Sequence, residues 1–327
     1  MNQYRWHERI LKKFNLYQIY TSIADRKEIE LINKIISKKK HSLEKTKEYE
    51  SILRKISRPE KVHRMLEYAL LNKSYMEFHR LRSFIKEKYK EDRYTNDFDS
   101  LIYEDDLDYI VKKIYQNRIY NDDLKTLVNG KKIAIVAPLT NKNDICEINH
   151  YDLRVSFNYY YGSIANEDLL INISYYNHEA VNKYDLNNVS NQNIFMVFKS
   201  KSDYKDQKKK YGNEKNKGYL NNDRSLVYGR YGSFALQSAV IDLIKYKPKA
   251  IKIFGANFYA SKKIYNTSYG KNEKTWQGLR LHDPISNFNF LKNVRKLGII
   301  EFDELGNSVI EKSSYEYAGL LDELYPL

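Results

Sequence analysis

Residues 228–259 read YGRYGSFALQSAVIDLIKYKPKAIKIFGANFY, and the succession of patterns in this stretch decides the fold class. Residues 230–233 (RYGS) predict a turn that starts a helix, because Gly permits unusual backbone angles and a Ser side chain can cap a helix. Residues 250–254 (AIKIF) alternate as in a strand and stop at residues 255–259 (GANFY). Between these segments, apolar residues recur at helical spacing up to Pro248, which ends the helix. They are Phe234, Leu236, Ala239, Val240, Leu243 and Ile244.

The two turns of this stretch, at residues 230–233 and 255–259, are candidates for a ligand site. In open α/β sheets a ligand binds at the carboxyl ends of the strands, and loops of this kind are found there. We therefore expect both turns to line one crevice.

The sequence upstream and downstream predicts the rest of a sheet. Residues 131–138 (KKIAIVAP) form a short apolar run bounded by Gly130 and Pro138, which is typical of a buried parallel strand. The alternation of strands and connections predicts an α/β domain over residues 129–327, with a mostly parallel, Rossmann-like sheet flanked by helices. Further strands are expected at 151–158, 168–174, 193–198 and 298–302, a helix at 287–294, and an amphipathic helix from Ser313 onward.

Two polar stretches interrupt this pattern. Residues 199–224 are rich in lysine and poor in apolar residues, which favours a mobile surface loop. Since this stretch runs directly into the 230–233 turn, a lid over the crevice is the alternative interpretation. Residues 261–277 form a second polar stretch that could order when a ligand binds.

Residues 1–128 predict an all-helical N-terminal domain. Ile29, Ile32, Ile35 and Ile36 fall on one helical face, and Leu66, Ala69 and Leu70 repeat the pattern. A packing domain with solvated charged faces is one interpretation. A surface for a membrane, an acceptor or a partner is the other, supported by the basic run Lys38, Lys39 and Lys40.

Composition sets the class of protein. A chain of 327 residues with 42% hydrophobic content can bury a substantial core. The single cysteine, Cys146, excludes a disulfide framework and a cysteine-rich metal site, which fits a reducing compartment. No apolar run is long enough to span a bilayer, and the N-terminus lacks the apolar core of a signal peptide, so we expect a cytoplasmic protein.

The net charge of +14 suggests anionic partners. Clustered Lys and Arg attract phosphates, so nucleic acid, an anionic membrane surface and an acidic glycan are all compatible with it. The lysines are spread along the whole chain, however, which makes the charge a weak indication of nucleic-acid binding.

The common catalytic signatures are missing from the sequence. It contains no GxGxxG, no P-loop, no HExxH and no GxSxG. The Asp pairs Asp97/Asp99 and Asp106/Asp108 precede the predicted sheet, so they do not stand at a strand end where a nucleotide would bind. We therefore expect no metal site.

Side chains in and after the 255–259 turn are candidates for acid–base chemistry and for contacts to a phosphate. His282 has an ordinary pKa near neutrality, so it can take a proton from an alcohol. The neighbouring Asp283 could orient the ring of His282 or cap the next helix. Tyr259 and Tyr265 carry hydroxyls that can donate hydrogen bonds to a departing phosphate, in place of a metal ion.

Taken in order, these segments resemble the bacterial sialyltransferases that use CMP-activated sugars. The resemblance rests on residues 135–136, 155–158 (VSFN), 232–233, 253–259 (IFGANFY) and His282, and covers about residues 130–310. Its most specific part is Gly-x-Asp/Asn-Phe-Tyr after a strand, followed by a second Tyr and then by the His. It implies a nucleotide-binding catalytic domain of the GT-A-variant sialyltransferase type.

The resemblance also implies roles for individual residues. His282 would deprotonate the acceptor hydroxyl, and Tyr259 and Tyr265 would stabilise the leaving CMP phosphate. Asn257 stands where the family has Asp, and residues 137–141 (APLTN) replace a Gly-Asn-Gly-type turn, so that Asn141 is the candidate substitute there. The implied nucleotide-binding residues are Asn141, Asn158, Arg230, Gly232, Ser233, Gly255 and Asn257.

The predicted activity is an inverting, metal-independent transfer of sialic acid or a related keto-sugar acid. It runs from a CMP-activated donor to a hydroxyl of a cell-surface glycan, free or lipid-linked, with no cofactor. The resemblance would place the protein in the cytoplasm or at the cytoplasmic face of the inner membrane. The alternatives are a CMP-Kdo-dependent transferase of similar fold and a non-catalytic protein that binds glycans or nucleic acid.

Overall fold

The computed structural model divides the chain into two compact units, Met1–Ile85 and Lys86–Leu327. Helix α6 (Tyr75–Asp92) spans the point of division. The predicted helices of residues 1–65 lie outside the described residues, and the domain boundary expected at residue 128 stays a prediction. The structure describes residues 66, 69–70, 74–92, 99–116, 121–159, 169–183, 186, 189, 193–211, 217–220, 226–227, 233–261, 279 and 282–326.

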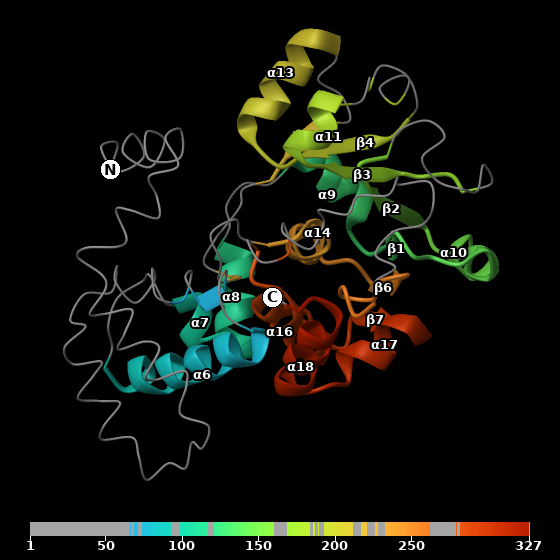
Figure 1. The fold of residues 1–327 in the computed structure, drawn as a ribbon. Coiled ribbons are helices and arrows are strands. Elements are labelled where there is room, and N and C mark those ends of the chain that lie inside the picture. The colour runs from blue at the N-terminus through green and yellow to red at the C-terminus, as the bar shows by residue number, and fades with distance from the viewer. Residues whose placement is uncertain are drawn as a thin grey trace. The chain divides into compact units, whose positions relative to one another are not determined.

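The second unit is built on a sheet whose described strands all run parallel (Figure 1). The strands are β1 (Lys132–Val136), β2 (Leu153–Phe157), β3 (Ile173–Tyr176), β4 (Phe195–Phe198), β5 (Lys217–Tyr219), β6 (Ala250–Phe254) and β7 (Ile300–Phe302). Their order is β5–β4–β3–β2–β1–β6–β7. The chain therefore moves outward from β1 to β5 and then returns to the other side of β1, so the strand order reverses between β1 and β6. Such a switch point is where open α/β sheets bind ligands.

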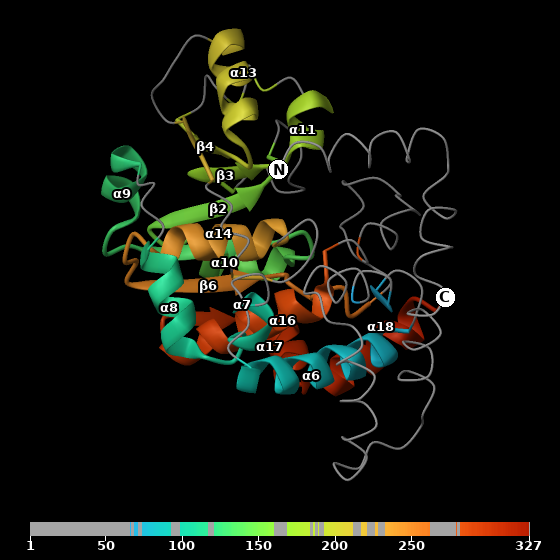
Figure 2. The same ribbon diagram turned by 90° about the vertical axis from the view of Figure 1, so that its left-hand side faces the viewer.

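Helices cover both faces of this sheet, as expected for a parallel sheet. Tyr175 and Tyr176 are neighbours on β3, so their side chains point to opposite faces. Tyr175 bonds to Asp242 in α14 (Ala235–Ile244), whereas Tyr176 lies in an apolar cluster with Ala180 and Val181 of α11 (His178–Lys183). Figure 2 gives the view in which α14 lies in front of the strands and α10 (Ile145–Ile148) behind them.

The described helices of this unit connect and follow the strands. Those before β1 are α7 (Asp99–Ile102), α8 (Leu107–Gln116) and α9 (Asp122–Val128). Between β1 and β6 come η2 (Lys142–Asp144), α10 (Ile145–Ile148), α11 (His178–Lys183), α13 (Lys201–Tyr211) and α14 (Ala235–Ile244). After β6 come α16 (Pro284–Val294), η4 (Arg295–Leu297), α17 (Glu304–Ile310) and α18 (Ser314–Leu324). None of the helices in the described parts of the chain combines the length and apolar character that a membrane crossing requires.

The central strands are buried along nearly their whole length. Residues Ile133 to Val136 of β1 are all buried, and so are all four residues of β3 and of β4. Burial of continuous apolar runs removes a large apolar area from water, which is the main favourable contribution to folding. It also explains why short uniform apolar runs, rather than alternating ones, mark these strands in the sequence.

The expected strands at 131–138, 151–158, 193–198, 250–254 and 298–302 are confirmed, and so are the helices at 287–294 and after Ser313. The strand expected at 168–174 begins later, as β3 (Ile173–Tyr176). Leu169 and Ile171, whose apolar side chains extended the strand pattern, are buried in the segment that leads into it.

The surface loop expected at 199–224 is wrong, since this segment contains helix α13 and strand β5. The buried face of α13 carries Asp203 and Gln207 in place of aliphatic residues. A helix whose inward face is polar lacks the apolar periodicity by which helices are recognised in a sequence.

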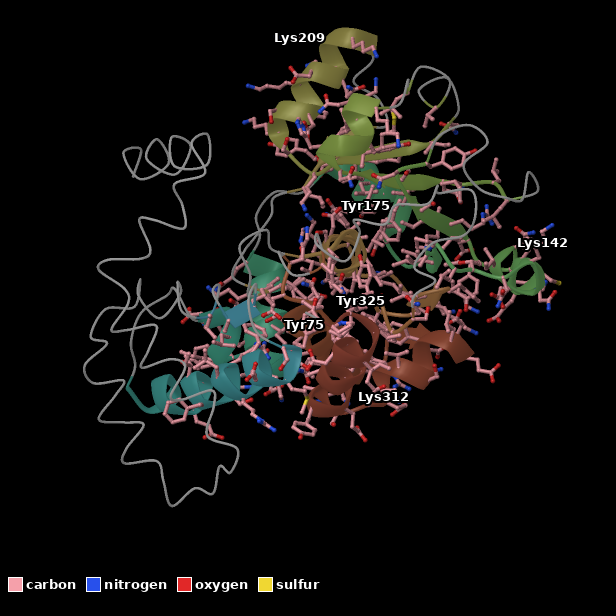
Figure 3. The ribbon with its side chains drawn as sticks, viewed as in Figure 1. Tyr75, Lys142, Tyr175, Lys209, Lys312 and Tyr325 are labelled. Atoms are coloured by element: carbon pink, nitrogen blue, oxygen red, sulfur yellow. The ribbon has the colours of Figure 1, made fainter. Side chains whose placement is uncertain are left out.

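A buried polar cluster joins α14 to the sheet (Tyr175 is labelled in Figure 3). The Tyr175 hydroxyl donates to Asp242 Oδ2 at 2.9 Å, and Lys245 Nζ pairs with Asp242 Oδ1. Each of these three residues is at most 5% exposed. Burial, together with the adjacent Asp242 carboxylate, raises the pKa of Tyr175 well above its usual value, so the hydroxyl stays a donor.

Replacing Tyr175 with Phe is expected to lower the free energy of unfolding by about 1.5–3 kcal/mol, since the substitution removes one hydrogen bond to a buried charged group. Urea denaturation at neutral pH measures the change. Tyr115→Phe is the matched control, because Tyr115 is 39% exposed, and we expect it to stay within about 0.5 kcal/mol of wild type. Equal stability of the two variants would mean that the Tyr175 hydroxyl contributes nothing.

Candidate functional site

The candidate site lies at the carboxyl ends of β1 and β6, on the two sides of the switch point. Asn141 follows β1, Asn158 follows β2, and residues 255–259 follow β6. His282 directly precedes the N-cap of α16. Of the predicted site residues, Arg230, Gly232 and Tyr265 lie outside the described part of the chain.

An aromatic contact brings three segments of the site together. The ring of Phe234 lies 4.9 Å from the ring of Tyr259 and 4.8 Å from the ring of His282, measured between centroids. These distances are typical of paired aromatic side chains. Tyr259 and His282, both predicted to be catalytic residues, therefore share Phe234 as an aromatic neighbour.

Phe234 is also the N-cap residue of α14, with an extended backbone and no side-chain cap. The expectation that Ser233 caps this helix is wrong, because Ser233 Oγ instead bonds to Ser238 Oγ at 2.6 Å. Ser238 is a residue of α14, and its hydroxyl takes the place of the main-chain amide that the Ser233 hydroxyl would bond to if it capped the helix. A helix start without a side-chain cap leaves its first amide groups for solvent or an anionic ligand.

The turn that carries Tyr259 has an unusual backbone. Gly255, Phe258 and Tyr259 have positive φ angles of 69°, 52° and 63°. For bulky residues this conformation is unfavourable and persists only where the surroundings impose it. The Asn257 side chain, which is 7% exposed, is one such restraint: its Oδ1 accepts from Tyr259 N at 3.1 Å, and its Nδ2 donates to Ser261 Oγ at 2.7 Å.

Two tyrosines from the C-terminal segment donate hydrogen bonds to the main chain of the same turn. The Tyr317 hydroxyl donates to the Phe258 carbonyl at 2.5 Å, and the Tyr325 hydroxyl donates to the carbonyls of Tyr259 and Ser261 at 3.0 and 2.9 Å. Burial raises the pKa of Tyr325, labelled in Figure 3, to about 12, so it stays protonated and able to donate. Sequence reasoning missed both residues, since hydroxyl contacts to a distant main chain leave no pattern among 31 tyrosines.

Gly255 stands where the turns after β1 and β6 touch. A Cβ atom at this position would lie 2.0 Å from Thr140 N and 2.5 Å from the carbonyl carbon of Leu139. The Gly255 amide donates to Asp303 Oδ2 at 2.6 Å. Burial raises the pKa of Asp303, while the hydrogen bonds from the amides of Gly255 and Gly306 oppose that rise.

Asn158 joins the ends of β2 and β3. It has a positive φ of 51°, and its Oδ1 accepts from Asn177 N at 3.0 Å. The side chain is only partly buried, and within the described chain its Nδ2 makes no hydrogen bond. As far as the described residues go, this amide group is a candidate for a ligand contact. Asn141, in contrast, is exposed, and its main-chain amide donates to Asp144 Oδ2 at 3.0 Å.

Asp283 caps α16. The sequence left open whether it orients His282 or caps the helix, and its Oδ1 accepts from the amides of Ile285 and Ser286 at 3.1 and 3.0 Å. Asp283 is fully buried, and its φ of 42° turns the chain sharply between His282 and α16. The left-handed backbone conformation of Asp283, at the start of α16, therefore sets the position of His282.

A second histidine lies at the carboxyl edge, and sequence reasoning missed it. His178, at the start of α11, places Nδ1 2.6 Å from Oδ1 of the buried Asp203, and Asn182 Nδ2 lies 3.0 Å from its Nε2. An Asn182 amide that donates to Nε2 puts the ring proton on Nδ1, toward Asp203. The only sequence signal is an Asn-His pair after a strand, which is weak.

Within the described residues, no three His, Cys, Asp or Glu side chains gather into a group that could hold a metal ion. The Asp106 side chain accepts from Tyr109 N at 2.9 Å and so belongs to the start of α8. Asp97 lies outside the described residues.

Neither a protein-family model nor a curated protein matches this chain. We therefore infer the function from the geometry of the site and from the chemistry of its side chains.

Proposed function

We propose that the unit Lys86–Leu327 is a glycosyltransferase that moves sialic acid or a related keto-sugar acid from a CMP-activated donor to a hydroxyl of a glycan. One observation carries the proposal: His282 and Tyr259 lie against the same ring, that of Phe234, beside the switch point of a parallel sheet. A proton acceptor and a hydroxyl donor are the two groups that a metal-free transfer from a phosphate ester requires.

The proposed reaction is a single displacement. The acceptor hydroxyl attacks the anomeric carbon while its proton passes to the His282 imidazole. The bond between that carbon and the phosphate oxygen breaks, and its electron pair leaves with CMP, so the configuration inverts. The hydroxyls of Tyr259 and Tyr265 donate to the departing phosphate, where negative charge increases.

In this proposal the donor phosphate lies near the start of α14. The first amides of an uncapped helix and its macrodipole favour an anion there. Arg230, Gly232 and Ser233 precede this helix start and are assigned to the cytidine nucleotide. On the other side, the Nδ2 group of Asn158 is assigned to the phosphate or ribose.

The turns after β1 and β6 have a supporting part in the proposal. Gly255 and Asn257 shape the turn that presents Tyr259, because the main chain of Gly255 touches Thr140 and the Asn257 side chain closes the turn. Asn141 is exposed at the end of the other turn, where it is assigned to the donor. The basic net charge suits an anionic donor and a membrane-linked acceptor at the cytoplasmic face of the inner membrane.

The test is release of CMP from a panel of CMP-sugars that includes sialic acid and Kdo donors, with glycan acceptors, in the presence and absence of EDTA. We expect turnover with at least one donor, unchanged by EDTA. Loss of turnover in EDTA would contradict the metal-free mechanism. Absence of turnover together with salt-sensitive oligonucleotide binding would favour the nucleic-acid alternative, and glycan binding without turnover would favour a non-catalytic glycan-binding protein.

A further inference from the structure

One buried amide side chain connects the His282 loop to the start of α14. Asn287, in α16, is 1% exposed. Its Oδ1 accepts from Phe234 N at 2.9 Å, and its Nδ2 donates to the carbonyls of His282 and Asp283 at 2.6 and 3.0 Å. The Asn287 side chain therefore bonds to the main chain of both His282 and Phe234, and the rings of these two residues pack against each other.

The contacts of Asn287 require an amide at this position. The start of α14 offers an N–H donor, while the loop before α16 offers two carbonyl acceptors. Only a side chain with both an acceptor oxygen and two N–H donors matches all three groups. An ionised Asp has the same shape but would set an oxygen against two carbonyl oxygens, and an aliphatic residue would leave all three groups unmatched.

We propose that Asn287 is a positioning residue that fixes the His282 imidazole relative to the N-terminus of α14. The inference rests on the proposed function, in which α14 lies against the donor phosphate and His282 activates the acceptor. Asn287 itself touches neither substrate. Its effect is on the distance between the proton acceptor and the reacting carbon, to which reaction rates are very sensitive.

The same helix supplies a matched control. Asn289 is 4% exposed, but its Oδ1 bonds to Ser314 Oγ at 2.6 Å, which joins α16 to α18 rather than to His282. Loss of the Asn287 side chain removes three hydrogen bonds, and loss of the Asn289 side chain removes one. A merely structural role would lower stability at both positions without moving the His282 imidazole.

The experiment compares Asn287→Ala, Asn287→Asp and Asn289→Ala for kcat, donor KM, melting temperature and the His282 imidazole resonances in ¹⁵N-histidine spectra. For both Asn287 variants we expect kcat to fall by about tenfold to a hundredfold. Donor KM should change by less than about threefold, and the His282 resonances should move. Asn289→Ala should lower the melting temperature while kcat and the His282 resonances stay as in wild type. If Asn287→Ala does not fold, the isosteric Asn287→Asp gives the same comparison.

The inference is overturned if the Asn287 variants keep the wild-type kcat and His282 resonances, or if Asn289→Ala moves both as much. Failure of the proposed function looks different, because wild-type protein would then turn over no CMP-sugar. In that case the His282 resonances still test the positioning role. A shift of these resonances in the Asn287 variants but not in Asn289→Ala supports that role even when no activity is measurable.

Discussion

Replacing His282 with Ala is expected to reduce transfer by about 10²–10⁴-fold, the usual contribution of a general base. The affinity for CMP should stay close to that of wild type, because the proposed donor contacts come from residues at and before the start of α14, from Asn158 and from Asn141. Removing the imidazole leaves the acceptor hydroxyl without a proton acceptor. Initial rates of CMP release give the first quantity, and calorimetric titration with CMP gives the second.

The matched control is His178→Ala, which removes the other described histidine at the carboxyl edge. His178 is hydrogen-bonded to the buried Asp203, and by geometry alone this His–Asp pair is a more conventional general base than His282. Transfer should nevertheless survive its loss, because His178 follows β3 and not the strands at the switch point. Survival of transfer in His282→Ala together with its loss in His178→Ala would move the base role to the His178–Asp203 pair.

The sheet could be predicted because its strands carry their own signal. Apolar runs such as residues 132–136 end at Gly or Pro, and burial on both faces makes such runs continuous. Helix α13 could not be predicted in this way, because its buried positions hold Asp203 and Gln207. The carboxylate of Asp203 is acceptable there because it pairs with His178, which is distant in the sequence.

The candidate site could be predicted only in part, for a related reason. Tyr259 and His282 stand out as residue types with chemistry near a strand end, and their common neighbour is Phe234. The residues that hold them, such as Asn287 and Tyr325, act through main-chain groups of distant segments. Contacts to main-chain atoms are independent of the partner's residue type, so they leave no paired signal in a single sequence.

Gly255→Ala is expected to be strongly destabilising, although it adds only one methyl group. The positive φ of Gly255 costs an L-residue about 1–2 kcal/mol. A Cβ atom would also lie 2.0 Å from Thr140 N, and main-chain atoms must move to relieve that overlap. Overpacking of this kind adds about 1–3 kcal/mol, so we expect a total loss of about 2–5 kcal/mol in the free energy of unfolding.

Gly298→Ala isolates the part of this effect that belongs to the site. Gly298 has a φ of 75°, close to that of Gly255, but a Cβ atom there has no other atom within 4 Å. Gly298→Ala should therefore lower the free energy of unfolding only by the backbone strain of about 1–2 kcal/mol and leave CMP binding unchanged.

The additional loss of free energy of unfolding in Gly255→Ala, measured by urea denaturation, is the energy of the close approach between the turns after β1 and β6. Because moving these turns also moves Tyr259, weaker CMP binding should accompany that excess. Equal stability of the two variants would mean that the turns can separate without cost, and that their contact does not define the site.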